Sequence, residues 1–200
     1  MKPPSVRRVA WSVVFGCAVL TAVVVVLTLP GNFPNATVRI GDRISAVLAE
    51  ITLPIKIANL SLQKPDEALL MPVYGMTVSR VSNTWQAPRG TDRVHDGQDI
   101  FSPRGTPVFS ATRGYVRRAG VNTLGGNYVM ITGAGGRRYY YAHFDRIAEG
   151  IEPGAKVTTD TVLGFVGNTG NAVTTPPHLH FGVYEGRTAL NPLPLLVDRP

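Results

Sequence analysis

A stretch of alternating residues, His178–Tyr184, constrains the fold of this chain more than any other feature. Its apolar side chains share one face and its histidines share the other: Leu179, Phe181 and Val183 against His178 and His180. A period of two is typical of a half-buried β-strand whose apolar face covers a core. Two imidazoles side by side on the open face favour a metal site, because both rings lean into the same space.

Short apolar runs separated by turn residues extend from about Leu70 towards the C-terminus. The chain contains 21 glycines and 16 prolines, and this favours a β-rich fold with many turns. The expected strands lie within Gly105–Ala111, Gly114–Ala119, Asn127–Thr132, Arg137–His143, Lys156–Val157 and Val162–Val166. Two of them form a hairpin around Gly133–Gly136. We therefore predict a mainly β fold in which antiparallel β-sheets pack in a sandwich-like domain.

A weak internal repeat accompanies these strands. Gly105-x-x-Val108 precedes Gly114-Tyr115-Val116, and Gly154-x-x-Val157 precedes Gly164-Phe165-Val166 at an interval that differs by one residue. The similarity indicates duplicated β units.

An uncharged apolar segment, Val9–Leu29, matches the roughly 20 residues that a helix needs to cross a bilayer. Lys2, Arg7 and Arg8 precede it, which predicts a cytoplasmic tail and a domain on the periplasmic or extracellular side. The alternative is a cleaved signal peptide, whose apolar region usually has about 7–15 residues before a small-x-small cleavage site. The longer segment favours an uncleaved, single-pass anchor in the cell membrane.

The sequence divides into four predicted parts. Residues 1–8 form a basic tail, 9–29 the transmembrane anchor, 30–69 a connector rich in proline and glycine, and 70–195 the β-rich domain. Within the connector, Gly41–Leu53 is expected to form a short helix or strand, because Ile44 and Val47 share a helical spacing with later apolar residues. The sequence does not indicate what the connector does.

Cysteine and charge narrow the chemistry of the domain. Cys17 is the only cysteine and lies in the apolar segment, so the external domain has no disulfide and no thiol ligand. Any metal there must be held by histidine and carboxylate. The net charge of the chain is +7, and only a mild positive excess remains when the basic N-terminal tail is left out. This excess is consistent with binding to an anionic cell wall, and equally with an ordinary solvated surface. The sequence has no stripe of basic residues with interleaved aromatic residues, so it gives no indication of nucleic-acid binding.

The four histidines of the chain suggest one zinc site. His95 and Asp99 lie four residues apart, with Gly97 between them allowing a bend, and His180 comes from a distant strand. Catalytic zinc usually takes three protein ligands and keeps an open position, whereas structural zinc has four ligands and is rich in cysteine. Each residue alone would most simply be an exposed polar residue without a specific role. Together His95, Asp99 and His180 predict a catalytic Zn²⁺ site.

His143 and His178 remain for the reaction. His178 lies about 6–7 Å from His180 along the strand, close enough to act near the metal without binding it. Alternation in Tyr139–His143 places Tyr139, Tyr141 and His143 on one face. Zinc lowers the pKa of its water to about 7, so one neutral histidine can act as the base and the other can stabilise the oxyanion. This set predicts hydrolysis of an amide.

These residues resemble a known family. The matching motifs are His95-x-Gly97-x-Asp99-Ile100, Tyr141-Ala142-His143, Gly167-Asn168-Thr169-Gly170-Asn171-Ala172 and His178-Leu179-His180-Phe181. They are similar to those of the lysostaphin-type, LytM-like zinc endopeptidases, from roughly Leu70 to Pro194. The resemblance implies a β-sheet groove, zinc on His95, Asp99 and His180, catalysis by His143 and His178, and cleavage of peptide cross-links in bacterial peptidoglycan. The bond cleaved, a regulator and the oligomeric state stay open.

Two other functions are consistent with parts of the sequence. A membrane-anchored, non-hydrolytic scaffold or activator of other cell-wall hydrolases is the main alternative, because some members of such a family lose their zinc ligands. A biotinyl- or lipoyl-like carrier would need an exposed lysine at a hairpin tip, and Gly133–Gly136 has none. Trp85, Tyr139 and Tyr141 are expected to be groove or core aromatics, without a choice between the two.

Overall fold

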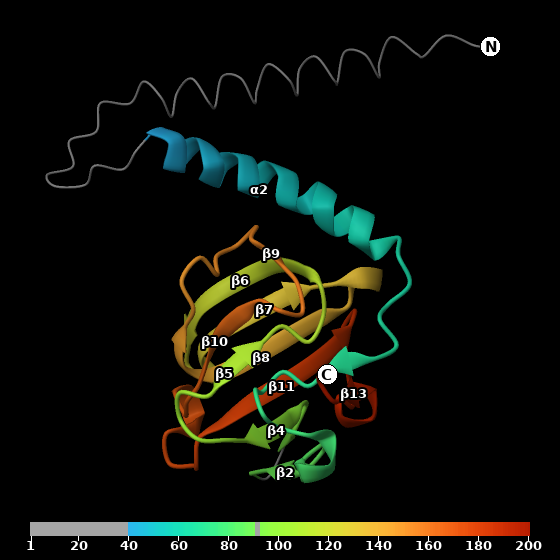
Figure 1. The fold of residues 1–200 in the computed structure, drawn as a ribbon, viewed down its shortest axis with the longest axis vertical. Coiled ribbons are helices and arrows are strands. Elements are labelled where there is room, and N and C mark those ends of the chain that lie inside the picture. Colours follow the sequence, from blue (N-terminus) through green and yellow to red (C-terminus); the bar gives the residue numbers. More distant parts are fainter. Residues whose placement is uncertain (1–39, 91–92) are drawn as a thin grey trace, which may run out of the picture. The chain divides into compact units, whose positions relative to one another are not determined.

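The computed structural model describes residues 40–90 and 93–200, which divide into two units between Ile51 and Thr52 (Figure 1). The structure expected within Gly41–Leu53 is a helix, α2 (Ile40–Ser61), which is longer than predicted and continues through Pro54. The anchor predicted at Val9–Leu29 lies outside the described residues. Among the helices that are described, none is long and apolar enough to cross a membrane.

The second unit is mainly β, as predicted. Nine strands form the large sheet: β4 (Gln98–Phe101), β5 (Pro107–Phe109), β6 (Gly114–Asn122), β7 (Gly126–Thr132), β8 (Arg138–Ile147), β9 (Lys156–Val157), β10 (Val162–Val166), β11 (His178–Glu185) and β12 (Thr188–Leu190). Two small sheets join β1 (Leu69–Leu70) to β13 (Leu196–Val197) and β2 (Pro88–Arg89) to β3 (Arg93–Val94). Short 3-10 turns lie at Val78–Arg80, Ala134–Gly136, Gly170–Ala172 and Leu193–Leu195.

The predicted sandwich is realised as one branched sheet rather than two separate ones. The main path runs β12-β11-β8-β7-β6-β9, and β4, β5 and β10 branch from it. The branch arises because β8 is long: Arg138–Ala142 pairs with β11, and Phe144–Ile147 pairs with β10. The long strands β6, β7, β8 and β11 lie side by side (Figure 1).

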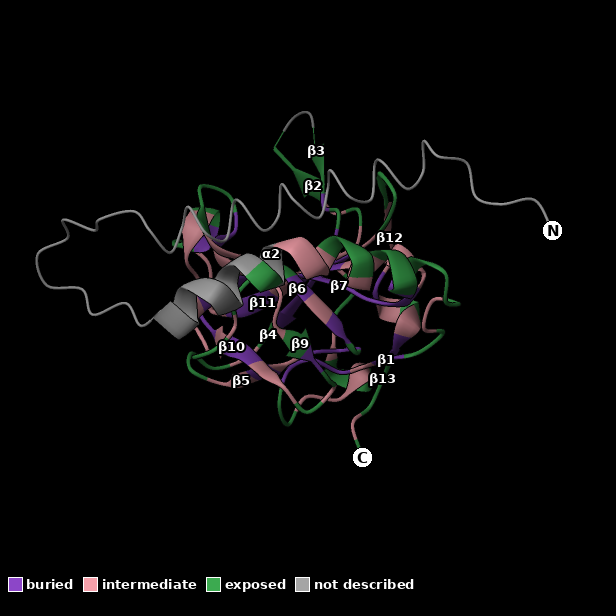
Figure 2. Cartoon of the chain, turned by 90° about the horizontal axis from the view of Figure 1, so that it is seen from above, coloured by how far each residue is buried: buried purple, intermediate pink, exposed green. Residues whose placement is uncertain are grey.

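The core lies under β11, as the alternation predicts. Leu179, Phe181 and Val183 are fully buried within a cluster that also contains Tyr139 and Tyr141. Figure 2 shows this burial along the strands of the large sheet, whereas β2 and β3 are exposed. Both tyrosines are therefore core residues, and Trp85 is partly buried. Burying a large apolar side chain stabilises a fold by about 1.5–3 kcal/mol, so this face fixes the register of β11.

The two copies of the weak internal repeat pair with each other, the first strand of each copy with the second strand of the other. The strand of Val108 pairs with the strand of Gly164, and the strand of Gly114 pairs with the strand of Val157. A Cβ on Gly164 would lie 2.8 Å from the carbonyl oxygen of Arg146, and one on Gly114 would meet the carbonyl oxygen of Thr132. Glycine recurs at equivalent places because the backbones approach too closely for a side chain.

Candidate metal centre and active site

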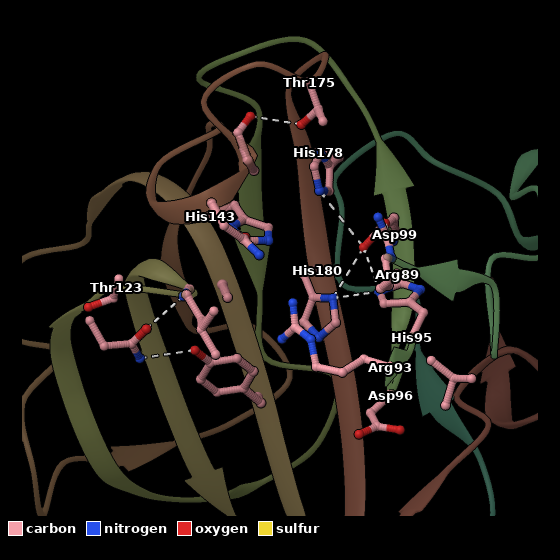
Figure 3. Close-up of a pocket in the computed structure, with 18 of the residues that line it drawn as sticks. Arg89, Arg93, His95, Asp96, Asp99, Thr123, His143, Thr175, His178 and His180 are labelled. Carbon is pink, nitrogen blue, oxygen red and sulfur yellow. Dashed lines mark hydrogen bonds and ion pairs between the residues drawn. The ribbon is translucent and has the colours of Figure 1, made fainter. Parts of the chain in front are cut away.

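Three residues bring ligand atoms together at the centre of Figure 3. His180 on β11 lies directly opposite Asp99 on β4 in the antiparallel register, and His95 lies just before β4. His180 Nδ1 is 3.2 Å from Asp99 Oδ1 and 2.8 Å from His95 Nε2, and His95 Nε2 is 3.0 Å from Asp99 Oδ1. Sequence reasoning named these three residues, and the structure brings them into one group able to hold a metal ion.

Neighbouring groups orient these ligand atoms. His95 Nδ1 donates to the carbonyl oxygen of Thr84 at 2.7 Å, which leaves Nε2 facing the group. Arg89 forms an ion pair with Asp99 Oδ2, so Oδ1 faces the two histidines. The backbone N–H of Asp99 donates to Thr84 Oγ1 at 2.8 Å. Such hydrogen bonds fix the rings and the carboxylate of a metal site before the metal binds.

The protonation states suit a cation. Burial alone would raise the pKa of Asp99, but hydrogen bonds and charge from His180 and His95 outweigh burial and hold that pKa well below its usual range. Burial lowers the pKa of His180 even though Asp99 favours its charged form. Asp99 is therefore ionised and His180 is driven towards the neutral ring, the forms that bind metal.

His178 lies beside this group without belonging to it. Its Nδ1 donates to the carbonyl oxygen of Pro176 at 2.8 Å. Its Nε2 lies 3.8 Å from Asp99 Oδ1, and only 4% of the residue is exposed. The ring is thus held by the backbone, and its second nitrogen faces the metal group across a short gap (Figure 3).

His143 reaches the same place through an irregularity in β8. It adopts a φ of 66°, which is uncommon for a residue with a side chain, and its N–H donates to the Gly125 carbonyl at 2.7 Å. The β7–β8 register shifts here, between the pairs of Asn127 and Val129, because β8 carries one extra residue. This β-bulge re-aims the His143 side chain.

The bulge corrects one expectation. Alternation placed His143 on the face of Tyr139 and Tyr141, but both tyrosines point into the core, and His143 lines the pocket together with Tyr140. The bulge shifts the alternation by one residue, so His143 changes face.

The His143 ring is fixed and neutral. Its Nδ1 donates to the carbonyl oxygen of Thr169 at 2.9 Å, so Nε2 carries the free lone pair. Burial, with added repulsion from His180 and His178, lowers the pKa of His143 to about 4. Its ring centre is 5.0 Å from that of His178 and 5.8 Å from that of His180. At neutral pH His143 can therefore accept a proton at Nε2.

All five residues line one pocket of about 560 Å³, together with Arg89, Arg93, Asp96, Tyr140 and Tyr184. Residues 93–192 match the sequence model of a protein family described as "Peptidase family M23". The chain belongs to peptidase family M23.

Three relatives illustrate the family. The L-Ala--D-Glu endopeptidase of Bacillus subtilis is 38% identical over 125 residues, which is 57% of this chain and 38% of that protein. The catalytic domain of lysostaphin from Staphylococcus simulans is 28% identical with a TM-score of 0.51, covering 58% of this chain and 92% of that domain. A zinc-containing peptidase from Vibrio cholerae is 28% identical with a TM-score of 0.52, covering 62% of this chain and 39% of that chain.

These matches confirm the resemblance to lysostaphin-type peptidases. This chain matches well under half the length of the Bacillus subtilis and Neisseria relatives, 38% and 27%. The shared part is thus the M23 domain.

The donor set of this M23 domain fits zinc. Two imidazole nitrogens and one carboxylate oxygen meet beside an open pocket, and the described residues offer them no thiolate. Two imidazoles and one carboxylate suit zinc at a catalytic site. Gly97 is adapted to this group because a Cβ there would lie 2.5 Å from His180 Cε1 and 2.7 Å from His180 Nε2. Gly97 therefore leaves room for the His180 ring, in addition to allowing the bend expected from the sequence.

Sequence reasoning missed the residues that orient the site. Arg89, Thr84 and Tyr140 had no distinguishing pattern, because their roles depend on pairing between segments distant in the sequence. Thr169 was only part of a family motif. In the structure its Oγ1 donates to the Phe144 carbonyl and its own carbonyl holds His143.

Proposed function

We propose that this chain is a zinc-dependent endopeptidase that hydrolyses peptide cross-links of bacterial peptidoglycan. One observation carries the proposal: three ligand atoms and the two other histidines of the chain meet in one pocket. Membership of family M23 supports it, as do relatives named as peptidoglycan DD-endopeptidase and lysostaphin.

The proposed metal ligands are His95 Nε2, Asp99 Oδ1 and His180 Nδ1. When bound, zinc polarises a carbonyl group and lowers the pKa of a water molecule to about 7. The remaining work falls to the chain's own side chains. Arg89 keeps Asp99 in position, and the Thr84 carbonyl keeps His95 in its ligating orientation.

His143 and His178 take different roles in this proposal. His143 is neutral with a free lone pair at Nε2, so it takes the proton from the attacking water. His178 already donates from Nδ1, and its Nε2 faces the metal group. With a proton on Nε2, His178 stabilises the oxyanion of the tetrahedral state.

The site of action belongs to the same proposal. The basic tail and the apolar segment Val9–Leu29 support an anchor in the cell membrane with the M23 domain facing the wall. Protease added outside spheroplasts should then remove the domain and leave the N-terminal segment in the membrane. Protection of the domain until lysis would contradict this location.

The test combines metal counting with digestion. The full chain should bind one zinc ion and release cleaved peptides from purified peptidoglycan, and a chelator should stop the release. His180→Ala should lose zinc and activity, whereas His178→Ala should keep zinc and lose most turnover. Bound zinc without cleavage under any condition would favour the non-hydrolytic scaffold. Loss of zinc in His178→Ala would refute the role given to that residue.

A further inference from the structure

A second cavity of about 480 Å³ adjoins the proposed active site. Three arginines line it, Arg118, Arg138 and Arg187, with Tyr128 and Tyr184 among the other lining residues. Within residues 40–90 and 93–200, no aspartate or glutamate lines this cavity. A concave surface with one sign of charge concentrates ligands of the opposite sign.

The arginines of this cavity are available for a ligand. Arg118 and Arg187 are exposed, and neither forms an ion pair or a side-chain hydrogen bond with any residue that the structure describes. Arg138 donates to the Gly186 carbonyl and lies over the Tyr184 ring, 5.7 Å from its centre. By contrast, neighbouring Arg137 is fully engaged by Glu185 and the Asp66 carbonyl. Guanidinium groups without partners are suited to planar carboxylates.

The two cavities adjoin and share three lining residues. Asn122, Tyr140 and Tyr184 line both. Tyr140 packs its ring edge-on to His180, 6.0 Å between centres, and Asn122 donates to the Tyr140 hydroxyl at 3.1 Å. Tyr184 donates to the Asp96 carbonyl at 3.3 Å. The arginine-lined cavity therefore lies next to the metal group, with Tyr140 and Tyr184 at the boundary.

Strand register gives the spacing between the two. On β8 and β11, Ala142 pairs with His180 and Arg138 pairs with Tyr184. Arg138 is thus four residues along β8 from Ala142, the residue opposite His180, which corresponds to about 13 Å at about 3.3 Å per residue. An extended peptide covers this distance in about four residues.

The charge on either side of the junction sets a direction. Asp96 and Asp99 are the acidic residues among those lining the first pocket, and Asp99 is neutralised by Arg89. Two arginines, Arg89 and Arg93, also line the first pocket and balance its two carboxylates, whereas the second cavity has three arginines and no carboxylate among its described lining residues. A peptide without carboxylates, such as a glycine bridge, would leave these three positive charges uncompensated.

We propose that the arginine-lined cavity is a substrate subsite that binds a carboxylate, so that this chain selects acidic peptides carrying a free carboxylate about four residues from the bond cleaved. The inference rests on the proposed function for the reaction but concerns the choice of substrate. It favours acidic stem peptides over neutral bridges.

The test uses two versions of one stem-type peptide, with either a free carboxylate or a carboxamide on its Glu residue. Turnover is measured with the zinc-loaded full chain, and binding by calorimetry with His143→Asn to prevent cleavage. Asparagine tolerates the positive φ of this position. The carboxylate peptide should bind and react about tenfold better, since one charge-assisted hydrogen bond is worth at least a factor of about ten. The preference should weaken with added salt.

The decisive variant is Arg118→Gln with Arg187→Gln, in which the preference should fall below about threefold. The matched control is Arg117→Gln with Arg80→Gln, which removes two exposed charges outside both cavities and should keep the preference. Equal binding of the two peptides by the unaltered chain would overturn the subsite, as would an unchanged preference in the double variant or binding of polyphosphate in place of the carboxylate peptide.

Binding and turnover separate the two proposals. Carboxylate-dependent binding without cleavage would support the subsite and refute the endopeptidase. Cleavage of both peptides at equal rates would do the reverse.

Discussion

Gly97 lies against the imidazole of His180, and this contact gives a prediction at the scale of one atom. Adding a methyl group in Gly97→Ala places a Cβ within 2.7 Å of two His180 ring atoms and 2.9 Å from the Phe181 carbonyl. The backbone cannot yield easily, so the ring must move. We expect zinc affinity to fall on the order of 10–100-fold, as for other losses of ligand orientation. Calorimetric titration with zinc measures it.

The matched control is Gly182→Ala on the neighbouring strand. Its Cβ would also meet a side chain at 2.8 Å, but that side chain is Tyr184, outside the metal group. Zinc affinity should stay within about threefold of the unaltered chain, since no ligand moves. Equal losses in both variants would show that the effect of Gly97→Ala is general unfolding.

Tyr139 and Tyr141 are adjacent core tyrosines whose hydroxyls differ. Tyr141 accepts a hydrogen bond from the N–H of Ala111 at 2.9 Å, whereas the buried Tyr139 hydroxyl has no hydrogen-bond partner among the described residues. Tyr141→Phe should therefore lower the free energy of unfolding by about 1–3 kcal/mol, because it leaves a buried N–H unpaired. Tyr139→Phe should change it by less than about 1 kcal/mol or raise it. Urea unfolding of both variants checks the order; the reverse order would contradict it.

Alkaline pH should destabilise the M23 domain through the same tyrosines. Burial raises the pKa of Tyr139 to about 12, with Arg137 offsetting part of the effect, and burial also raises the pKa of Tyr141. In the unfolded chain a tyrosine ionises near pH 10. Between about pH 10 and 12 the unfolded state thus binds fewer protons, so stability falls as pH rises. Unfolding free energies measured from pH 9 to 12 should decline less steeply in Tyr139→Phe.

Single residues show where sequence reasoning succeeds. The proximity of His95 to Asp99 and of His178 to His180 was predictable, because the spacing within each pair encodes one bend or one strand face. That the two pairs meet depends on the pairing of β4 with β11. The face of His143 was not predictable, because alternation cannot reveal an extra residue in β8. Arg89 and Tyr140 were not either, since a long-range ion pair and a ring contact leave no local pattern.

At the scale of elements, strand positions followed from the pattern and sheet connectivity did not. The runs Lys156–Val157 and Val162–Val166 became β9 and β10 at their predicted bounds. The branching of one sheet at β8 depends on how a long strand divides its two edges among three partners. That division is set by tertiary packing, which periodicity does not encode.

The β8 bulge and the Gly167–Thr175 segment act together to hold His143. Thr169 Oγ1 accepts from the Asn127 N–H at 2.9 Å and donates to the Phe144 carbonyl at 2.9 Å. Asn127 also donates to the carbonyls of Phe144 and Asp145. These bonds fix the Thr169 carbonyl that accepts from His143 Nδ1.

Thr169→Val tests this support, because it keeps the shape of the side chain and removes both hydroxyl bonds. We expect zinc binding to remain and kcat to fall about 10–100-fold, since the proposed base loses its orientation. The His143 Nδ1 proton should also exchange faster with solvent in NMR spectra. Thr158→Val is the control and should change neither, because this exposed turn residue bonds to Thr161 and does not line the pocket. Loss of zinc together with activity would contradict a purely positioning role.

For the M23 domain as a whole, the metal group joins segments far apart in the sequence. His180 is 85 residues from His95 and 81 from Asp99. Two imidazole nitrogens and one carboxylate oxygen face one another where β4 pairs with β11. A ligand that binds only the folded state stabilises it by about 4 kcal/mol at a thousand times its Kd. Zinc should therefore raise the thermal unfolding midpoint of the full chain, and a chelator should reverse the rise.

Asp99→Asn decides whether this stabilisation comes from the proposed group. The substitution preserves shape but removes the charge that zinc requires, so the zinc-dependent rise should disappear even though the variant is folded. Asp145→Asn is the matched control: this carboxylate pairs with Arg104 at 2.5 Å and lines neither cavity, so its zinc response should equal that of the unaltered chain. A full zinc response in Asp99→Asn, measured by calorimetry, would place the metal elsewhere in the chain and refute the ligand set.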